Sequence, residues 1–160
     1  MRIAIGSDER NHLTDFVVED VRRRGHDVIL FGALATDDPE SDWPVVSSRV
    51  ATAVARGAAD EGIVCCWTGT GASIAANKVP GIRAALSRDA ETARGSRIWN
   101  HANVLALSLR ATSEPVAREI LDAWFGTRID SGEAQSEWNR QQIEQIRKLE
   151  ARYAGSHEKR

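Results

Sequence analysis

The sequence has little cysteine, no long hydrophobic run and almost no net charge. Its two cysteines, Cys65 and Cys66, are adjacent in a chain of 160 residues. They are too few for a disulfide scaffold or a zinc site, so we expect a reducing compartment, the cytoplasm. No apolar run approaches the roughly 20 residues that a membrane helix needs, and the first residues lack the apolar stretch of a signal peptide. The formal net charge of −2 gives no electrostatic basis for binding nucleic acid or an acidic membrane.

Short apolar segments alternate with amphipathic ones along residues 1–126. Five apolar segments predict strands, at residues 2–6, 27–31, 63–66, 82–86 and 103–107. Helices are expected between the strands, with Asp89 as an N-cap, and after the last strand at 114–125. Strands that alternate with helices imply βαβ units and a parallel sheet. The sequence therefore predicts a single α/β domain, a five-stranded parallel sheet with helices on both faces.

A long polar helix is expected at residues 133–153, outside the α/β core. Its apolar positions are sparse: Trp138, Ile143, Ile146, Leu149 and Tyr153. A stripe this thin suits packing against a partner subunit better than a place in the main core. A frayed end is expected at residues 155–160.

The most informative stretch is residues 62–78, where a strand, a glycine turn and a small-residue helix follow one another. The turn, Thr68-Gly69-Thr70-Gly71, lets the backbone adopt positive φ and approach a ligand closely. The free N–H groups at the start of the helix attract negative charge. Cys66 stands at the carboxyl end of the strand, where ligands bind to open α/β sheets. The turn alone is not specific, because it matches neither the G-x-G-x-x-G fingerprint nor a P-loop.

Three segments carry a longer and more specific string: Cys66-Trp67-Thr68-Gly69-Thr70-Gly71, Ser73-Ile74-Ala75-Ala76-Asn77-Lys78 and Gly81-Ile82-Arg83-Ala84. This string resembles the core of the ribose-5-phosphate isomerase B and galactose-6-phosphate isomerase family, which reads C-G-T-G-x-G-x-S-I-A-A-N-K and then G-I-R-A. The resemblance extends from Met1 to about Ala123. It implies a Rossmann-like three-layer sandwich and an aldose–ketose isomerase without a metal or an organic cofactor. It also implies a homodimer or tetramer in which the C-terminal helix reaches a partner subunit.

An aldose–ketose isomerase needs a base that moves a proton between C2 and C1, and groups that stabilise the enediolate between the two steps. The resemblance implies that Cys66 is this base. A helix start favours its thiolate, and the same N–H groups hold the oxyanion. The alternative is that Cys66 is a small buried hydrophobe, as most cysteines are. That alternative is favoured for Cys65, because alternation along the strand points it to the other face.

The turn after Cys66 is expected to bind the sugar. By the resemblance, Thr68 helps ring opening or orients the hydroxyls; alternatively it caps a turn. Gly69, Thr70 and Gly71 would supply the anion hole, the alternative being a tight turn without a ligand. Trp67 is also expected at the substrate.

Six residues outside the turn are expected at the substrate: Asp8, Glu9, Trp43, Trp99, Asn100 and Arg110. Asp8 would bind a sugar hydroxyl, or else serve as a turn or N-cap aspartate. Trp43, in Asp42-Trp43-Pro44, would wall the sugar, or else lie against its own helix. Asn100 would bind a substrate oxygen. Arg110 matches a family arginine.

Three departures from the family pattern concern phosphate binding and proton transfer. Glu9 stands where the family has a histidine, and its carboxylate would repel a phosphate. Trp99 stands at the ring-opening histidine and cannot transfer a proton at neutral pH, while His101, two residues later, would need a shifted loop to replace it. In the tail, Glu133 or Trp138 stands at the first arginine of the phosphate clamp, depending on the alignment.

These departures predict a substrate other than ribose 5-phosphate, although the family-typical reaction converts ribose 5-phosphate to ribulose 5-phosphate. The predicted substrate is a smaller or open-chain sugar phosphate, or a sugar without phosphate. Two other functions fit the same features: a non-catalytic sugar or nucleotide sensor, and an epimerase that uses the same enediolate. Cys66 argues against the sensor.

Overall fold

Strands and helices alternate along the core of the chain. The computed structural model describes residues 1–154, and the expected frayed end lies outside the described residues. The core elements are, in chain order, β1 (Arg2–Ser7), α1 (His12–Arg23), β2 (Asp27–Gly32), α2 (Trp43–Ala55), β3 (Glu61–Cys66), α3 (Thr70–Ala76), β4 (Ala84–Leu86), α4 (Ala90–Asn100), β5 (Val104–Ser108) and α5 (Glu114–Gly126). The 3-10 helix η1 (Gly132–Gln135) and α6 (Glu137–Ala154) follow them. None of the helices in this described part is long and apolar enough to cross a membrane.

The five strands form one parallel sheet in the order β2-β1-β3-β5-β4. From β1 the chain crosses to β2 on one side, and from β3 onward it builds the other side. The order therefore reverses between β1 and β3, and their carboxyl ends form the switch point where open α/β sheets bind ligands. Ser7 lies opposite Cys65 in this register.

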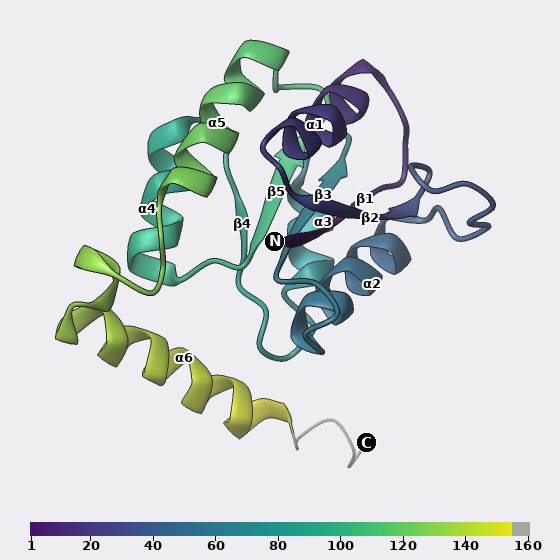
Figure 1. Ribbon diagram of the computed structural model, residues 1–160. Coiled ribbons are helices and arrows are strands. Elements are labelled where there is room, and N and C mark those ends of the chain that lie inside the picture. The colour runs from purple at the N-terminus through teal and green to yellow at the C-terminus, as the bar shows by residue number, and fades with distance from the viewer. Residues whose placement is uncertain (155–160) are drawn as a thin grey trace.

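Helices cover both faces of the sheet (Figure 1). One apolar cluster joins the sheet to α1, α4 and α5, and the other joins it to α2 and α3. Cys65 belongs to the first cluster and Cys66 to the second, so adjacent cysteines point to opposite faces as strand alternation requires. The predicted Rossmann-like three-layer sandwich with five parallel strands is confirmed.

Polar side chains fix where several helices begin. At α1, Asn11 Oδ1 accepts from the Thr14 N–H at 3.1 Å, and Thr14 Oγ1 accepts from the Asn11 N–H at 2.9 Å, which makes a capping box. At α4, Asp89 accepts from the Thr92 N–H at 2.6 Å, which confirms the predicted N-cap. At α2, Pro44 occupies the first turn, where a helix needs no N–H donor.

Two predicted boundaries are wrong. The C-terminal α-helix begins at Glu137, because Ser136 has extended backbone and its Oγ accepts from the Asn139 N–H at 3.3 Å. The residues before it form η1, where the Asn139 side chain donates to the Glu133 carbonyl at 2.8 Å. β4 begins at Ala84, because the Arg83 N–H donates to the Asn103 side chain at 2.8 Å.

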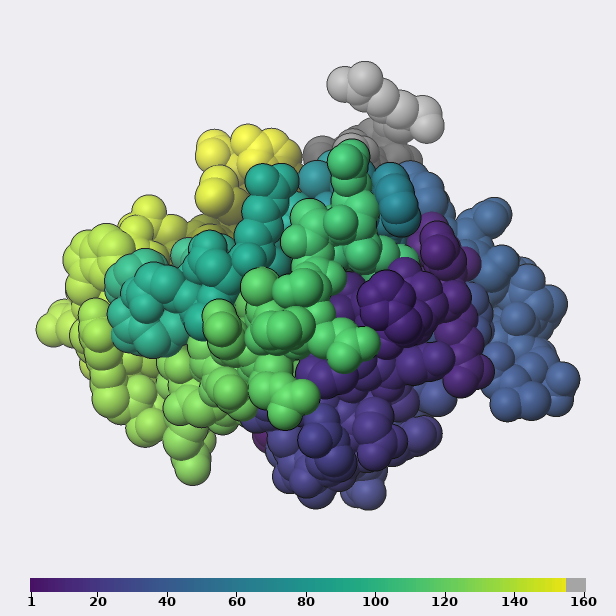
Figure 2. Space-filling model, turned by 90° about the horizontal axis from the view of Figure 1, so that it is seen from above, coloured from purple at the N-terminus to yellow at the C-terminus, as the bar shows by residue number. Residues whose placement is uncertain are grey.

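The helix α6 lies beside the core as an arm. It and the loop between β2 and α2 lie at opposite sides of the molecule (Figure 1, Figure 2). Among the large apolar side chains of α6, that of Ile143 is buried. Four others are exposed: Trp138, Ile146, Leu149 and Tyr153. The expected thin apolar stripe is therefore present, and most of it faces solvent in the single chain.

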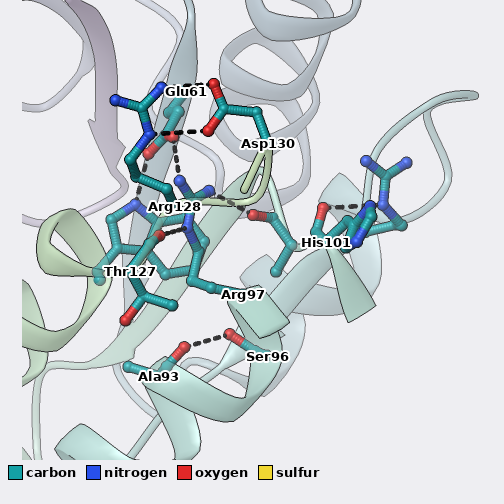
Figure 3. A network of polar contacts seen from close by, with 11 residues as sticks. Glu61, Ala93, Ser96, Arg97, His101, Thr127, Arg128 and Asp130 are labelled. Atoms are coloured by element: carbon teal, nitrogen blue, oxygen red, sulfur yellow. Dashed lines mark hydrogen bonds and ion pairs between the residues drawn. The ribbon is translucent and has the colours of Figure 1, made fainter. Parts of the chain in front are cut away.

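A buried ion pair ties the sheet to α4 and α5 (Figure 3). Arg97 Nη2, on α4, lies 2.5 Å from Glu61 Oε1 at the start of β3, and Trp124 Nε1 donates to the other Glu61 oxygen at 2.6 Å. Arg97 also donates to the carbonyls of Ala102 at 2.7 Å and Thr127 at 3.1 Å. These bonds hold the last turns of α4 at the amino end of the sheet.

Candidate active site

Cys66 and Asp8 stand at the carboxyl ends of the neighbouring strands β3 and β1, at the switch point. Ser7 is opposite Cys65 in the β1–β3 register. Asp8 and Cys66 each follow one of these two residues, so both lie at the same edge of the sheet. Cys66 is 5% exposed. Its carbonyl accepts from the N–H groups of Leu109 at 3.0 Å and Gly69 at 3.2 Å, so the turn folds back over the strand end. The end of β3 is thereby fixed against the turn.

The turn after Cys66 requires glycine at Gly69. Its φ is +75°, and a Cβ there would lie 2.5 Å from Leu86 Cδ1 and 2.9 Å from the Leu107 carbonyl carbon. Gly69 offers no side-chain cap, so the first N–H groups of α3 are left for another acceptor. Thr68 Oγ1 and Thr70 Oγ1 are hydrogen-bonded at 2.7 Å. The turn thus presents both N–H and hydroxyl groups beside Cys66.

Two tryptophans flank the turn. A Cβ built on Gly71 would lie 3.0 Å from Trp43 Cε3, so the Trp43 ring contacts the turn and not only its own helix. Trp67 is 57% exposed, and its carbonyl accepts from the Arg110 N–H at 3.1 Å. The Arg110 guanidinium lies 6.0 Å from the Trp67 ring centroid, which places a cation at the rim of the site.

Ser108 also shapes this turn, and the sequence analysis missed it. Its Oγ donates to the Trp67 carbonyl at 3.0 Å and accepts from the Ala111 N–H at 3.2 Å. Ser108 pairs with Cys66 in the β3–β5 register. Its position at the carboxyl end of a predicted strand was the signal that could have identified it.

Burial raises the pKa of two groups at this edge of the sheet, Cys65 and Asp8. Burial raises the pKa of the Cys65 thiol to about 12, with smaller contributions from Cys66 and Asp8, so Cys65 is a neutral core residue. Burial also raises the pKa of Asp8, and the charge of Glu9 adds to this, whereas nearby backbone N–H groups lower it. Glu9 itself is exposed, with its N–H donating to Ser7 Oγ at 3.3 Å.

A model of one protein family, described as Ribose/Galactose Isomerase, matches residues 3–143. The chain belongs to the ribose/galactose isomerase family. It is 38% identical over 152 residues to ribose-5-phosphate isomerase B of Escherichia coli, covering 94% of this chain and 97% of that protein. It is 34% identical over 143 residues to a D-erythrulose-4-phosphate isomerase of Pectobacterium atrosepticum, covering 82% and 87%.

The fold also agrees with that of a solved structure from this family. The solved structure of Clostridium thermocellum ribose-5-phosphate isomerase B superposes with a TM-score of 0.83 at 40% identity, covering 96% of this chain and 99% of that one. The predictions of this family and of an isomerase are confirmed.

Trp99 and Asn100 were expected in the site, but they lie at the amino end of the sheet, opposite the end that carries Cys66. The helix α4 starts beside the carboxyl end of β4 and returns to the strands' amino ends, so its last turn lies away from Cys66 (Figure 1). Asn100 lines a groove with Arg83 and with Ile146 of α6. Trp99 is 44% exposed, and its ring lies against Gly95 of its own helix. One chain does not bring these residues to Cys66.

His101 and Asn77 hold local structure in the isomerase fold. His101 is buried with φ +47°, and its Nε2 lies 2.7 Å from the Ala134 carbonyl, which ties the end of α4 to η1. Asn77 bonds both backbone groups of Ala84, at 2.9 and 2.8 Å, and so joins α3 to β4. Neither contact involves the turn after Cys66.

Proposed function

We propose that the chain interconverts an aldose phosphate and a ketose phosphate through a cis-enediolate, with Cys66 as the base. The observation that carries this proposal is the buried thiol of Cys66 at the switch point, beside the start of α3, where Gly69 makes no side-chain cap. The Cys66 thiolate takes the proton from C2 and returns it to C1. The N–H groups after Gly69 stabilise the oxygen that becomes negative between these steps.

The other groups at this edge have roles that follow from their chemistry. The hydrogen-bonded hydroxyls of Thr68 and Thr70 orient the sugar oxygens. The rings of Trp43 and Trp67 flank the sugar on two sides, and Arg110 takes the phosphate, because it is the cation that stands over the rim ring. Glu9 keeps the phosphate away from the β1 end of the site.

We propose that the substrate is a short, open-chain sugar phosphate. Trp67 fills space where the family string has glycine, which leaves less room at the rim than that string implies. An open-chain substrate needs no ring-opening acid, which is consistent with a tryptophan at residue 99. A relative named for D-erythrulose 4-phosphate falls within this substrate class.

A substrate panel tests this proposal. Wild-type protein is incubated with D-erythrulose 4-phosphate, D-ribose 5-phosphate, D-galactose 6-phosphate and their phosphate-free counterparts, and NMR follows aldose–ketose conversion. We expect kcat/KM about tenfold higher for the four-carbon phosphate than for the five-carbon one, the size of a one-carbon discrimination. A preference for ribose 5-phosphate or for the free sugars would contradict the substrate assignment. Binding of these sugars without conversion would favour a sensor, and inversion at C2 would favour an epimerase.

We also propose that the active unit is a homo-oligomer in which a second copy brings Trp99 and Asn100 to Cys66. The exposed apolar side chains of α6 flank the groove that contains Asn100, so an interface there would lie next to the end of α4. The protein would work in a reducing compartment such as the cytoplasm, where its two free thiols stay reduced.

Mixing two inactive variants tests the shared site. Cys66→Ala and Asn100→Ala are each expected to lose most activity as purified proteins. If sites are shared, co-expressed subunits form mixed dimers in which one of the two sites carries neither change, and activity returns to about a quarter of the wild-type value. Double-variant Cys66→Ala/Asn100→Ala mixed with wild type is the matched control. Absence of recovery in dimers shown to be mixed would contradict the shared site.

A further inference from the structure

One oxygen of the site has an unexplained environment. In residues 1–154, three buried side-chain polar atoms lack a hydrogen-bond partner: Asp8 Oδ1, Ser87 Oγ and Asn139 Oδ1. The first of them lies at the switch point, directly after β1, the strand that pairs with the Cys66 strand β3. A buried carboxylate oxygen without a donor is costly, because an ionised carboxylate only accepts hydrogen bonds. A protonated carboxyl, by contrast, can donate to a bound oxygen.

The surroundings of Asp8 favour the protonated form. On its own loop, Glu9 contributes a negative charge, and on β3 the Cys65 thiol interacts with Asp8. The nearest arginine in sequence, Arg10, is paired with Asp15 at 2.8 Å. Burial is the largest cause that raises the pKa of Asp8. Within the described chain, the charges that act on this carboxyl include no cation.

The proposed reaction includes a proton transfer between the two sugar oxygens to which no residue has been assigned. Converting an aldose to a ketose moves hydrogen from C2 to C1, and it also moves a proton from O2 to O1. Cys66 transfers the proton from C2 to C1. The threonine hydroxyls of the turn are too weakly acidic to serve the oxygens, and Trp99 carries no transferable proton.

We propose that Asp8 is a second catalytic residue, which carries the proton between the two sugar oxygens. The inference rests on the proposed function. In the first step the Cys66 thiolate removes the C2 hydrogen, which gives the enediolate, and the Asp8 carboxyl then donates its proton to O1. In the second step the Cys66 thiol returns its proton to C1 while the Asp8 carboxylate accepts the proton of O2, which becomes the carbonyl. Both side chains end in their starting states, and no oxidant or reductant is needed.

Deuterium exchange separates this role from simple binding. D-ribose 5-phosphate and D-erythrose 4-phosphate are each incubated with enzyme in D₂O, and NMR measures deuterium at C2 of the remaining aldose and the amount of ketose. In Asp8→Asn, the enediolate can still return to C2, but its passage to the ketose is blocked. We expect ketose formation to fall about 100-fold, within the range of acid–base catalysis, and the ratio of exchange to ketose to rise at least tenfold.

Controls distinguish the outcomes. Asp27→Asn makes the same change at the exposed start of β2 and should leave both rates unchanged. Asp8→Glu, which keeps an acid, should recover part of the ketose formation. Equal losses of exchange and ketose formation in Asp8→Asn, or a rise in KM alone, would overturn the proposal and leave Asp8 as a binding residue. Absence of exchange in the wild type would overturn the proposed function itself, and this inference with it.

A thermal unfolding series shows that the variant is folded. A carboxyl whose pKa is raised in the folded state adds stability below its unfolded pKa and loses it as the pH rises through its folded pKa. Asparagine stays neutral throughout. The Tm of Asp8→Asn is therefore expected to equal or exceed that of the wild type at pH 7, with the difference vanishing near pH 3. A lower Tm at pH 7 would show that Asp8 is needed for structure and would overturn the catalytic assignment.

Discussion

Replacement of Cys66 by alanine is expected to lower kcat about 1,000-fold while leaving the fold intact. In the proposed mechanism the thiol is the base that both carbon steps need, and positioned acid–base groups contribute about 10²- to 10⁴-fold. The strand end does not depend on the sulfur, because the contacts that fix the turn are made by the Cys66 carbonyl. The measurement is kcat and KM with the best substrate of the panel, together with circular dichroism of the variant.

Cys65→Ala is the matched control, because it removes the same atom one residue earlier. Cys65 faces the opposite apolar cluster, and its pKa of about 12 keeps it a neutral thiol. We expect kcat within about twofold of the wild type and a stability loss of about 1 kcal/mol, typical of a small core truncation. If the two alanine variants lost activity equally, or if Cys66→Ala retained it, Cys66 would not be the base.

The contrast between these two cysteines was predictable from sequence, because strand alternation is a local property. The same holds for the strand–turn–helix at Cys66 and for the edge on which Asp8 and Trp43 lie. Each of these follows from a short segment whose ends are fixed by neighbouring residues. Local patterns of this kind placed the candidate site at the carboxyl ends of β1 and β3.

The environment of Asp8 was not predictable in this way. Its unpartnered oxygen results from how β1, β3 and the following loops close around it, which no single segment determines. The position of Trp99 shows a second limit. Its place in the family string groups it with Cys66, whereas the helix that carries it ends at the opposite edge of the sheet. A pattern describes a site, but it does not say which copy of the chain supplies each residue.

The Glu61–Arg97 pair is the clearest case of a tertiary feature hidden from the sequence. From the sequence, charged residues at the start of a strand and in a helix are expected to be exposed. The side chains of Glu61 and Arg97 are only 10% and 6% exposed. Trp124, from α5, supplies both a hydrogen bond to Glu61 and a ring face 4.6 Å from the Arg97 guanidinium. Only the packing of three elements brings these groups together.

Arg97→Met is therefore expected to reduce the free energy of unfolding by about 3–5 kcal/mol, the cost of leaving one partner of a buried ion pair. Methionine keeps the apolar stem against Trp124, so the loss reflects mainly the charge and the bonds to Glu61, Ala102 and Thr127. Urea unfolding with linear extrapolation measures it. Arg94→Met, which breaks an exposed pair with Glu91 on the same helix, should leave stability within experimental error.

A second change identifies the cause. Adding Glu61→Gln to Arg97→Met removes the buried charge that has lost its partner, while the glutamine oxygen can still accept from Trp124 Nε1. The double variant should therefore be more stable than Arg97→Met alone, because two neutral partners are cheaper to bury than one unpaired charge. An additive loss would mean that the pair contributes through packing. Because Arg97 also holds the turn that carries Trp99 and Asn100, variants that stay folded are expected to lose activity in proportion to how far that turn is released.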